Sequence, residues 1–319
     1  MKILQILPEM HEGGVERHVL WLSNELAAMG HDVRVVSAGG KLESKLDGVR
    51  AMRLSVHLKN LFTALYSAAL LARAAKREKV DIIHAHSRVP AWISWWASAL
   101  SGVPWIITCH AFYSKNAGLI PYKKARTLIC VSEAVRTFFH DLFPETETKV
   151  VYNGLPQSPH RWNEPKEGPV KFLFVGRLTR KKGILALIEA FSKVNPGNWV
   201  LDIIGDGPLY DQIKEMIFAY GLENRVKLHG FCDVPEEWMA KCSCFLFPSL
   251  EEGMGLTLMR AVQMRVPVIA SDLPAVRELS LSHQALIVPD DVGEWAIAIN
   301  RFLKSGEGTA VFNVKKIPS

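Results

Sequence analysis

Short apolar runs and segments of helical period alternate along the first half of the chain. The runs cover residues 2–7, 32–38, 80–86, 104–110 and 127–132, and a helical segment extends from Arg17 to Met29. Runs of this length that alternate with helical segments predict a parallel β-sheet with helical crossovers. Most runs are apolar at successive positions, which indicates strands that are covered on both faces.

The same pattern begins again after a polar break that is rich in proline. The second series of apolar runs covers 170–176, 199–205, 226–230, 242–249, 267–271 and 285–289, and helical segments end at Phe191, Tyr220 and Met264. We therefore predict an α/β fold of two Rossmann-like, doubly wound domains at 1–155 and 170–305, with a linker at 156–169 and a tail at 306–319. Open α/β sheets bind ligands beyond the carboxyl ends of their strands, so we expect a ligand cleft between the two domains.

Composition narrows the possible functions without choosing one. The chain is 49% hydrophobic and 22% charged, which is typical of a globular protein. A net charge of +6 and a pI near 9.0 favour anionic partners. Because neither zinc-finger spacing nor an aromatic-rich basic motif is present, nucleic acid is not an expected partner.

Two apolar segments bear on membrane association. Residues 2–7 are followed by Pro8 and polar residues, which indicates a first strand and no signal peptide. Residues 61–72 form the longest apolar stretch, which is shorter than the ~20 residues of a spanning helix. We expect a cytoplasmic protein, at most peripheral on the cytoplasmic face of the inner membrane. The predicted helix 60–79 has an apolar body and a basic end that suits anionic lipid, although a packed helix with a solvated end explains the pattern equally well. The basic residues are Arg73, Lys76, Arg77 and Lys79.

The five cysteines are odd in number and lie mostly in apolar runs, as reduced core residues do. Cys242 and Cys244 lack the second pair or the histidines that a zinc site requires. We therefore predict no metal and no other cofactor.

Three glycine-containing turns carry candidate chemistry. Gly13 and Gly14 lie between a predicted strand and helix, where backbone N–H groups bind phosphate, although a simple tight turn is as good an explanation. Lys181 and Lys182 follow Arg177 after another strand, and fixed cations there suit a diphosphate leaving group, although a solvated basic loop has the same composition. The stretch 248–257 leaves a strand and opens a helix, and it combines anion-binding glycines with a carboxylate suited to sugar hydroxyls.

Ten short motifs follow one another along nearly the whole chain. They are GGVE (13–16), DIIHAH (81–86), TCH (108–110), VSEAV (131–135), NG (153–154), GRLTRKKG (176–183), IGDGP (204–208), LHGF (228–231), PSLEEGMGL (248–256) and PVIAS (267–271). Together they resemble the retaining glycosyltransferases of family 4, which have the GT-B fold. SAGG (37–40) and HAHSRVPAW (84–92) further resemble a subgroup associated with lipopolysaccharide and related envelope glycans.

The resemblance implies a role for each matching residue. The catalytic set would be His110 beside the reacting sugar, Glu252 holding that sugar, and Arg177 and Lys182 neutralising the diphosphate. Phe231 would contact the nucleotide base. The other implied donor-binding residues are Gly13, Gly14, Gly176, Gly205, Gly253, Gly255, Leu256 and Thr257. The acceptor-side candidates are Glu16, His86 and Arg88. The implied partners are a nucleotide-sugar donor and a glycan or lipid-linked glycan acceptor.

The chain departs from the family pattern in its second half. Arg260 occupies the position of a second glutamate that typically binds the donor ribose, and Arg265 replaces a family glycine. The usual Gly-Gly pair before Glu278 is also absent, and the segment after residue 305 is short. Two alternatives to a transferase therefore stay open: a non-catalytic protein that binds nucleotide sugars or other anions, and a nucleotide-sugar epimerase on the same architecture.

Overall fold

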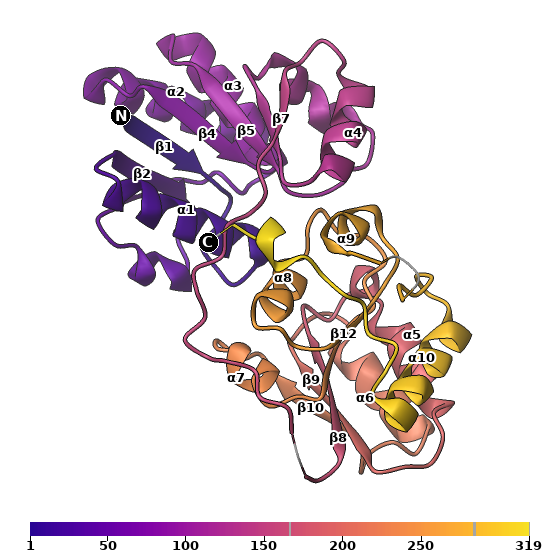
Figure 1. Ribbon diagram of the computed structural model, residues 1–319. Helices are drawn as coiled ribbons and strands as arrows, with labels where there is room; N and C mark the ends of the chain where they lie inside the picture. The colour runs from indigo at the N-terminus through magenta and orange to yellow at the C-terminus, as the bar shows by residue number, and fades with distance from the viewer. Residues whose placement is uncertain (166, 283–284, 319) are drawn as a thin grey trace. The chain divides into compact units, whose positions relative to one another are not determined.

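The computed structural model describes residues 1–165, 167–282 and 285–318. The chain forms two compact units, Met1–Gly154 and Leu155–Ser319. Each unit has its own parallel sheet with helices around it (Figure 1). The division follows Gly154, one residue before the end expected for the first domain.

Unit 1 contains a seven-stranded parallel sheet in the order β3-β2-β1-β4-β5-β6-β7. The strands are β1 Lys2–Ile6, β2 Asp32–Ser37, β3 Arg50–Arg53, β4 Ile82–His86, β5 Trp105–Cys109, β6 Leu128–Cys130 and β7 Thr148–Val150. The strand order reverses between β1 and β4, so the topological switch point of this doubly wound sheet lies beside the ends of those two strands.

The α-helices of unit 1 connect these strands. They are α1 Gly14–Ala28, α2 Leu61–Glu78, α3 Arg88–Ser101 and α4 Glu133–Leu142. Short 3-10 helices cover Lys41–Lys45 and Ala117–Lys124. Helix α2 packs against α3. Small residues such as Ala68 and Ala72 form its buried side, and its other side is exposed.

Unit 2 contains a five-stranded parallel sheet in the order β10-β9-β8-β11-β12. The strands are β8 Val170–Val175, β9 Trp199–Ile204, β10 Val226–Gly230, β11 Cys244–Phe247 and β12 Val268–Ala270. The α-helices are α5 Ile184–Ser192, α6 Tyr210–Ala219, α7 Glu236–Met239, α8 Leu256–Gln263, α9 Pro274–Leu279 and α10 Val292–Ser305. Every residue of β11 is buried, as a central strand covered on both faces requires.

The structure confirms the predicted parallel α/β architecture and corrects it at several points. The run 285–289 was expected as a strand, but Ile287 forms only an isolated bridge to Ser271. Pro289 and the left-handed Asp290 turn the chain toward α10 there. The first helix begins at Gly14, three residues before its expected start, with Gly13 as its N-cap. The edge strands β3 and β7 are short and were not predicted.

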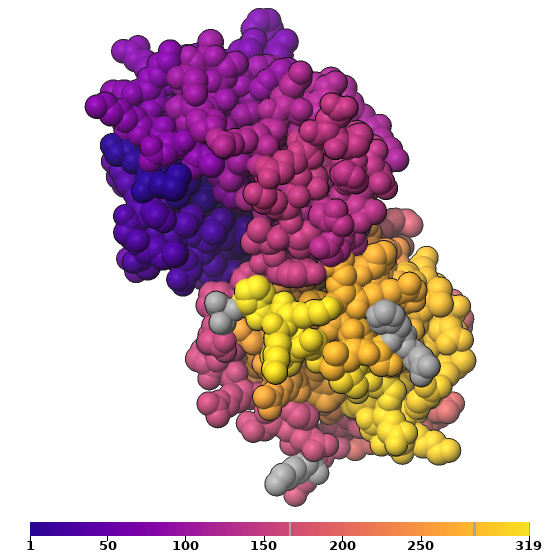
Figure 2. All heavy atoms as spheres, turned by 45° about the horizontal axis from the view of Figure 1, so that its top comes forward, coloured from indigo at the N-terminus to yellow at the C-terminus, as the bar shows by residue number. Residues whose placement is uncertain are grey.

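The segments expected as linker and tail make backbone contacts within unit 2. In the linker, the Asn163 N–H donates to the Ala240 carbonyl over 3.3 Å, and in the tail, the Ala310 N–H donates to the Val268 carbonyl over 2.9 Å. Figure 2 shows the last part of the chain, in yellow, spread over the surface of this unit. Among the described residues, no helix has the length and apolar character needed to cross a membrane.

Candidate functional site

The predicted donor-site residues of unit 2 come from segments that follow the carboxyl ends of β8, β9, β10 and β11. Glycine permits the close approach of these segments. A Cβ on Gly205 would lie 1.9 Å from the Gly176 carbonyl oxygen, and one on Gly183 would lie 1.8 Å from the Pro248 carbonyl oxygen. Since atoms cannot approach so closely, both positions require glycine, whose positive φ angles add to the requirement.

The packing of Gly183 against Pro248 brings together two residues of the predicted catalytic set. Lys182 Nζ forms an ion pair with Glu252 Oε1, and the Ser249 hydroxyl donates to the same oxygen over 2.9 Å. The lysine side chain is 29% exposed and the glutamate 12% exposed. Lys181 pairs in parallel with Glu251, but these side chains are 67% and 39% exposed. Only the Lys182 pair is therefore substantially shielded from solvent.

The other predicted donor-site residues lie at the N-terminus of α8 or follow strands β8 and β10. Gly253 is buried, Gly255 is the N-cap residue of α8, and Leu256 and Thr257 begin the helix. The first N–H groups of a helix lack intrahelical acceptors, so this end of α8 suits an anion. The exposed Arg177 follows Gly176, and the described residues give its guanidinium no ion-pair partner. Phe231 follows β10 and is 43% exposed.

Arg260, at the position of the family's second glutamate, is committed to contacts within unit 2. Its Nε lies 3.0 Å from Glu236 Oε1, and its Nη1 donates to the Pro156 carbonyl over 2.5 Å. Gln263 also holds this segment, because its amide donates to the Leu155 carbonyl over 3.3 Å. The arginine is 7% exposed. The side chain therefore fastens the start of the linker segment to α8.

The glycine turn of unit 1 caps α1, as expected for GGVE. The Glu16 carboxylate folds back over Gly13, because a Cβ added there would lie 2.2 Å from Glu16 Oε2. An acidic side chain in the first turn interacts favourably with the positive end of the helix dipole. An anion binding beside Gly13 and Gly14 therefore requires Glu16 to move aside.

The predicted histidines of unit 1 are hydrogen-bonded to each other. His86 Nδ1 lies 2.9 Å from His110 Nε2, and His86 Nε2 lies 2.8 Å from Gln5 Oε1. The amide oxygen can only accept, so His86 Nε2 carries its proton, and His110 Nε2–H donates to His86 Nδ1. The chain of contacts fixes the tautomer and the orientation of both rings.

Two further histidines join this pair and were missed from the sequence. The His18 ring centroid lies 5.0 Å from that of His110, and the His84 centroid lies 4.3 Å from that of His86. His84 Nε2 also bonds the Thr108 hydroxyl over 2.7 Å. The alternation in His84-Ala85-His86 was the available signal, because residues two apart point to the same face of a strand. His18 lies on α1, so the sequence alone gave no sign of its proximity.

Burial controls the charge of all four histidines. It lowers the pKa of His18 to about 4 and that of His84 to about 3, where the neighbouring His18 adds to the effect. Burial is also the main cause of the pKa values of His86 and His110 lying well below the usual range, and the surrounding histidines lower both further. The four rings are therefore neutral near pH 7 and act as hydrogen-bonding groups or ligands.

The acceptor-side candidate Arg88 follows a strained connection. Ser87 has φ 80 and ψ 172, a region that is nearly restricted to glycine and costs on the order of 1–3 kcal/mol. It joins His86 at the end of β4 to Arg88 at the start of α3. The Arg88 guanidinium lies 5.3 Å from the centre of the Tyr113 ring. The turn therefore directs Arg88 toward the segment that follows β5.

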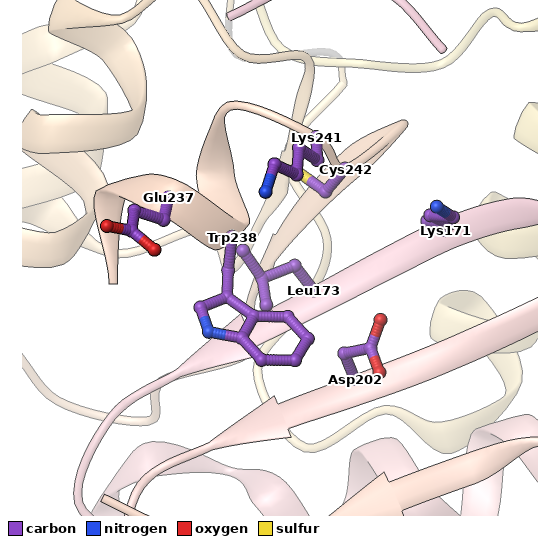
Figure 3. Close-up of a pocket in the computed structure, with 7 residues that line it drawn as sticks. All are labelled: Lys171, Leu173, Asp202, Glu237, Trp238, Lys241 and Cys242. Atoms are coloured by element: carbon purple, nitrogen blue, oxygen red, sulfur yellow. The ribbon is translucent and has the colours of Figure 1, made fainter. Parts of the chain in front are cut away.

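A pocket of about 240 Å³ lies elsewhere in unit 2, on the face of the sheet beneath α7. Figure 3 shows the Trp238 indole reaching toward Leu173 and Asp202 on the strands. The His229 ring bonds Asp202 Oδ1 over 2.7 Å beside it. None of the predicted site residues lines this pocket, whose lining is Lys171, Leu173, Asp202, Glu237, Trp238, Lys241 and Cys242. It is therefore distinct from the turns at the carboxyl edge.

Cys242 and Cys244 of unit 2 are held as thiols. Burial raises the pKa of Cys242 to about 12 and that of Cys244 well above the usual range. They belong to the core around β11.

Comparisons with known proteins assign a family model to each part of the chain. The model for Glycosyltransferase Family 4 matches residues 12–158, and the model for Glycosyl transferases group 1 matches residues 157–314. The two matches meet within the segment where unit 1 passes into unit 2.

Relatives and solved structures match over most of the chain. An uncharacterised glycosyltransferase of Methanocaldococcus jannaschii is 25% identical, over 89% of this chain and 83% of that protein. TuaC of Bacillus subtilis, described as a putative teichuronic acid biosynthesis glycosyltransferase, is 26% identical over 70% of this chain and 61% of its own. The crystal structure of Anabaena Alr3699/HepE in complex with UDP and glucose superposes with a TM-score of 0.83 at 22% identity, covering 97% of this chain and 91% of that one.

Proposed function

The chain is a glycosyltransferase of the GT-B type, and we propose that it transfers a sugar from a nucleotide-sugar donor to a growing envelope glycan with retention of configuration. The observation that carries the proposal is the shielded Lys182–Glu252 pair beside the N-terminus of α8. Negative charge accumulates on the diphosphate as its bond to the sugar breaks, and a fixed cation and helix N–H groups stabilise that charge.

Each member of the pair has a separate task in this proposal. When the donor binds, the Lys182 ammonium leaves the Glu252 carboxylate and pairs with the diphosphate. Arg177 is a second cation on the same turn. Glu252 then accepts hydrogen bonds from hydroxyls of the transferred sugar, and Ser249 keeps the carboxylate in place. The ion pair holds both side chains in position before the donor binds, which reduces the ordering cost of binding.

Unit 1 supplies the groups near the reacting sugar and the acceptor. His110 is neutral and its ring is fixed through His86 and Gln5, so it can hydrogen-bond a sugar hydroxyl without adding charge. Glu16, His86 and Arg88 are the acceptor-side candidates. The Glu16 carboxylate lies over Gly13 at the start of α1.

Retention is proposed to occur on one face of the sugar, with the departing phosphate assisting the acceptor hydroxyl and without a metal. With the donor bound, Glu252 accepts hydrogen bonds from Ser249 and from the sugar hydroxyls in this proposal, which argues against its use as a free nucleophile. Analysis of the product by NMR tests this step: an inverted anomeric centre would rule it out.

The proposal of an envelope acceptor is supported by the described role of the relative TuaC and by the side chains that α2 exposes. Large apolar side chains lie exposed at the start of this helix: Leu61 (59% exposed), Phe62 (82%), Leu65 (45%) and Tyr66 (67%). Basic residues lie on its last turns. We propose that this surface rests on anionic lipid at the cytoplasmic membrane face. Phe62→Ser and Leu65→Ser should then weaken binding to anionic vesicles, measured by sedimentation. Equal binding to neutral and anionic vesicles would contradict the electrostatic part.

The central test compares two adjacent lysines. We expect one nucleotide sugar from a panel of UDP-, GDP-, ADP- and CMP-sugars to raise the melting temperature of the wild-type chain. Lys182→Ala should abolish that stabilisation and reduce the transfer rate by about 10²–10³-fold, because one donor to the developing charge is lost. Lys181→Ala is the matched control, since its exposed pair with Glu251 should change either quantity less than about threefold. Equal loss in the two variants would refute the assigned role of Lys182.

The contacts of Arg260 favour a second candidate function, that of a protein that binds nucleotide sugars without transferring them. Its side chain is tied to Glu236 and Pro156 and supplies no carboxylate for the donor ribose. This candidate predicts donor-dependent stabilisation, lost in Lys182→Ala, with no product from any acceptor extract. Formation of a glycosylated product would exclude it.

A further inference from the structure

Unit 1 brings three histidine nitrogens together from three different elements. One ring nitrogen each of His18 on α1, His86 on β4 and His110 after β5 lies within 4.8 Å of the other two. In the described part of the chain, no other group of three such side chains comes so close. The resemblance to family 4 implies a role near the sugar for His110, but it does not account for the convergence of all three.

The surroundings of His86 have the arrangement of a metal ligand. Histidine ligands usually donate their second ring N–H to an oxygen, which fixes the ring and directs the other nitrogen at the metal. Here His86 Nε2 faces Gln5 Oε1 at 2.8 Å, while Nδ1 faces the other histidines. Gln5 is fully buried on β1, and its position is set by the register that pairs it with His84.

The protonation state and rigidity of the cluster also suit a ligand set. A histidine must be neutral to bind a metal, and burial lowers the pKa of all three rings, which favours the neutral form. His86 ends one central strand and His110 directly follows its neighbour, so the backbone beneath both ligands is held by the sheet. Rigid elements hold a ligand set more accurately than loops do.

The geometry points to a site for one imidazole-preferring transition-metal ion, best matched by Zn²⁺, with His18, His86 and His110 as its ligands. Zinc–nitrogen distances are about 2.0–2.1 Å, so tetrahedral ligand atoms lie roughly 3.4 Å apart. The His86–His110 contact must therefore open slightly from 2.9 Å, and His18 must close on both. The proton of that hydrogen bond moves to the other nitrogen of His110, so each ring stays neutral.

Three protein ligands leave a fourth position for water or a sugar hydroxyl. Mg²⁺ and Ca²⁺ prefer oxygen ligands and are not expected to bind. An ion bound here would occupy the nitrogen of His110, so zinc should inhibit transfer. That consequence rests on the proposed function, whereas metal binding itself does not.

The test measures binding directly on the full chain. Protein treated with a chelator and desalted is titrated with Zn²⁺ against a chromophoric zinc indicator. We expect one ion per chain, with affinity reduced at least about 100-fold in His18→Ala and in His110→Ala, and about 10–100-fold in Gln5→Leu. His140→Ala removes an exposed histidine on α4 and serves as the matched control, with unchanged affinity expected.

A spectroscopic measurement on the wild-type chain covers the case in which a variant fails to fold. Bound Co²⁺ should give the intense visible absorption of a tetrahedral site, and Zn²⁺ but not Mg²⁺ should displace it. Zinc affinity that is equal in wild type and in the double variant His18→Ala/His110→Ala, or a weak octahedral Co²⁺ spectrum, would overturn the site. A wild-type chain that transfers sugar but binds no zinc would also overturn the site and leave the proposed function standing. Zinc binding by a chain that transfers no sugar even in its metal-free form would refute only that function.

Discussion

The two units have the same kind of sheet but place opposite chemistry at its carboxyl edge. Unit 2 presents fixed charges, Lys182 and Glu252, that are paired and partly shielded on glycine turns. Unit 1 presents neutral imidazoles that are packed together and linked to Gln5. The difference shows how burial decides the role of a polar group. Partial exposure keeps a charge available for an anion, while deep burial removes the charge and leaves a hydrogen-bonding or metal-binding nitrogen.

The largest effect expected from this difference is on acid stability. The four clustered histidines of unit 1 (His18, His84, His86 and His110) have native pKa values below the value of about 6.5 expected in the unfolded chain. The unfolded state therefore binds more protons on acidification, and stability falls as the pH drops from 6.5 toward the native values of about 4 and 3. Each such histidine costs about 1.4 kcal/mol per pH unit in that window.

Hydrogen exchange can locate this loss. In buffer containing a chelator, corrected protection of β4 and β5 amides should fall between pH 7 and pH 5 faster than protection of β8 and β9 amides. The described residues of unit 2 include no buried histidine. An equal loss in the two sheets would show that the histidine cluster does not control acid stability.

A smaller effect is expected at the arginine that replaces the family glutamate. Arg260→Met should destabilise unit 2 by about 3–5 kcal/mol, because it leaves the shielded Glu236 carboxylate without its partner. Arg277→Met is the matched control: its pair with Asp272 is 52% exposed on the arginine side, so a change of about 0–1 kcal/mol is expected. Denaturant unfolding monitored by Trp fluorescence measures both variants. A change in Arg260→Met no larger than in the control would contradict a structural role for Arg260.

The smallest expected effect concerns backbone strain. Arg265 has φ 63, a left-handed conformation that costs a residue with a Cβ about 1–2 kcal/mol. Arg265→Gly removes this strain but increases the entropy of the unfolded chain, so a net stabilisation of about 0.5–1 kcal/mol is expected. Gln263→Gly, at the last residue of α8, should destabilise by at least about 1 kcal/mol, because it places glycine in a helix and also removes the amide that holds Leu155. A destabilising Arg265→Gly would show that the arginine side chain makes a compensating contact.

Much of the fold was predictable because burial on both faces leaves long apolar runs. The central strands β1, β4, β5, β8, β9 and β11 all lie within predicted runs. The failures have local causes. Edge strands β3 and β7 are short and polar, and they depend on a neighbour for pairing. The run 285–289 is apolar enough for a strand, but Pro289 and Asp290 end it before a ladder forms.

For the site, the sequence by itself determined which groups lie at the carboxyl ends of the strands, because strand ends and glycine turns are local features. His86, Lys182 and Glu252 were all identified in this way. Only the tertiary structure decided what these groups meet: Lys182 pairs with Glu252 across the turns of two strands, and Arg260 fastens the linker segment to α8. It likewise brought His18 from α1 to the histidines of β4 and β5. Such contacts join residues up to 104 positions apart, and their charges and protonation states follow from burial, which depends on the packing of the whole unit.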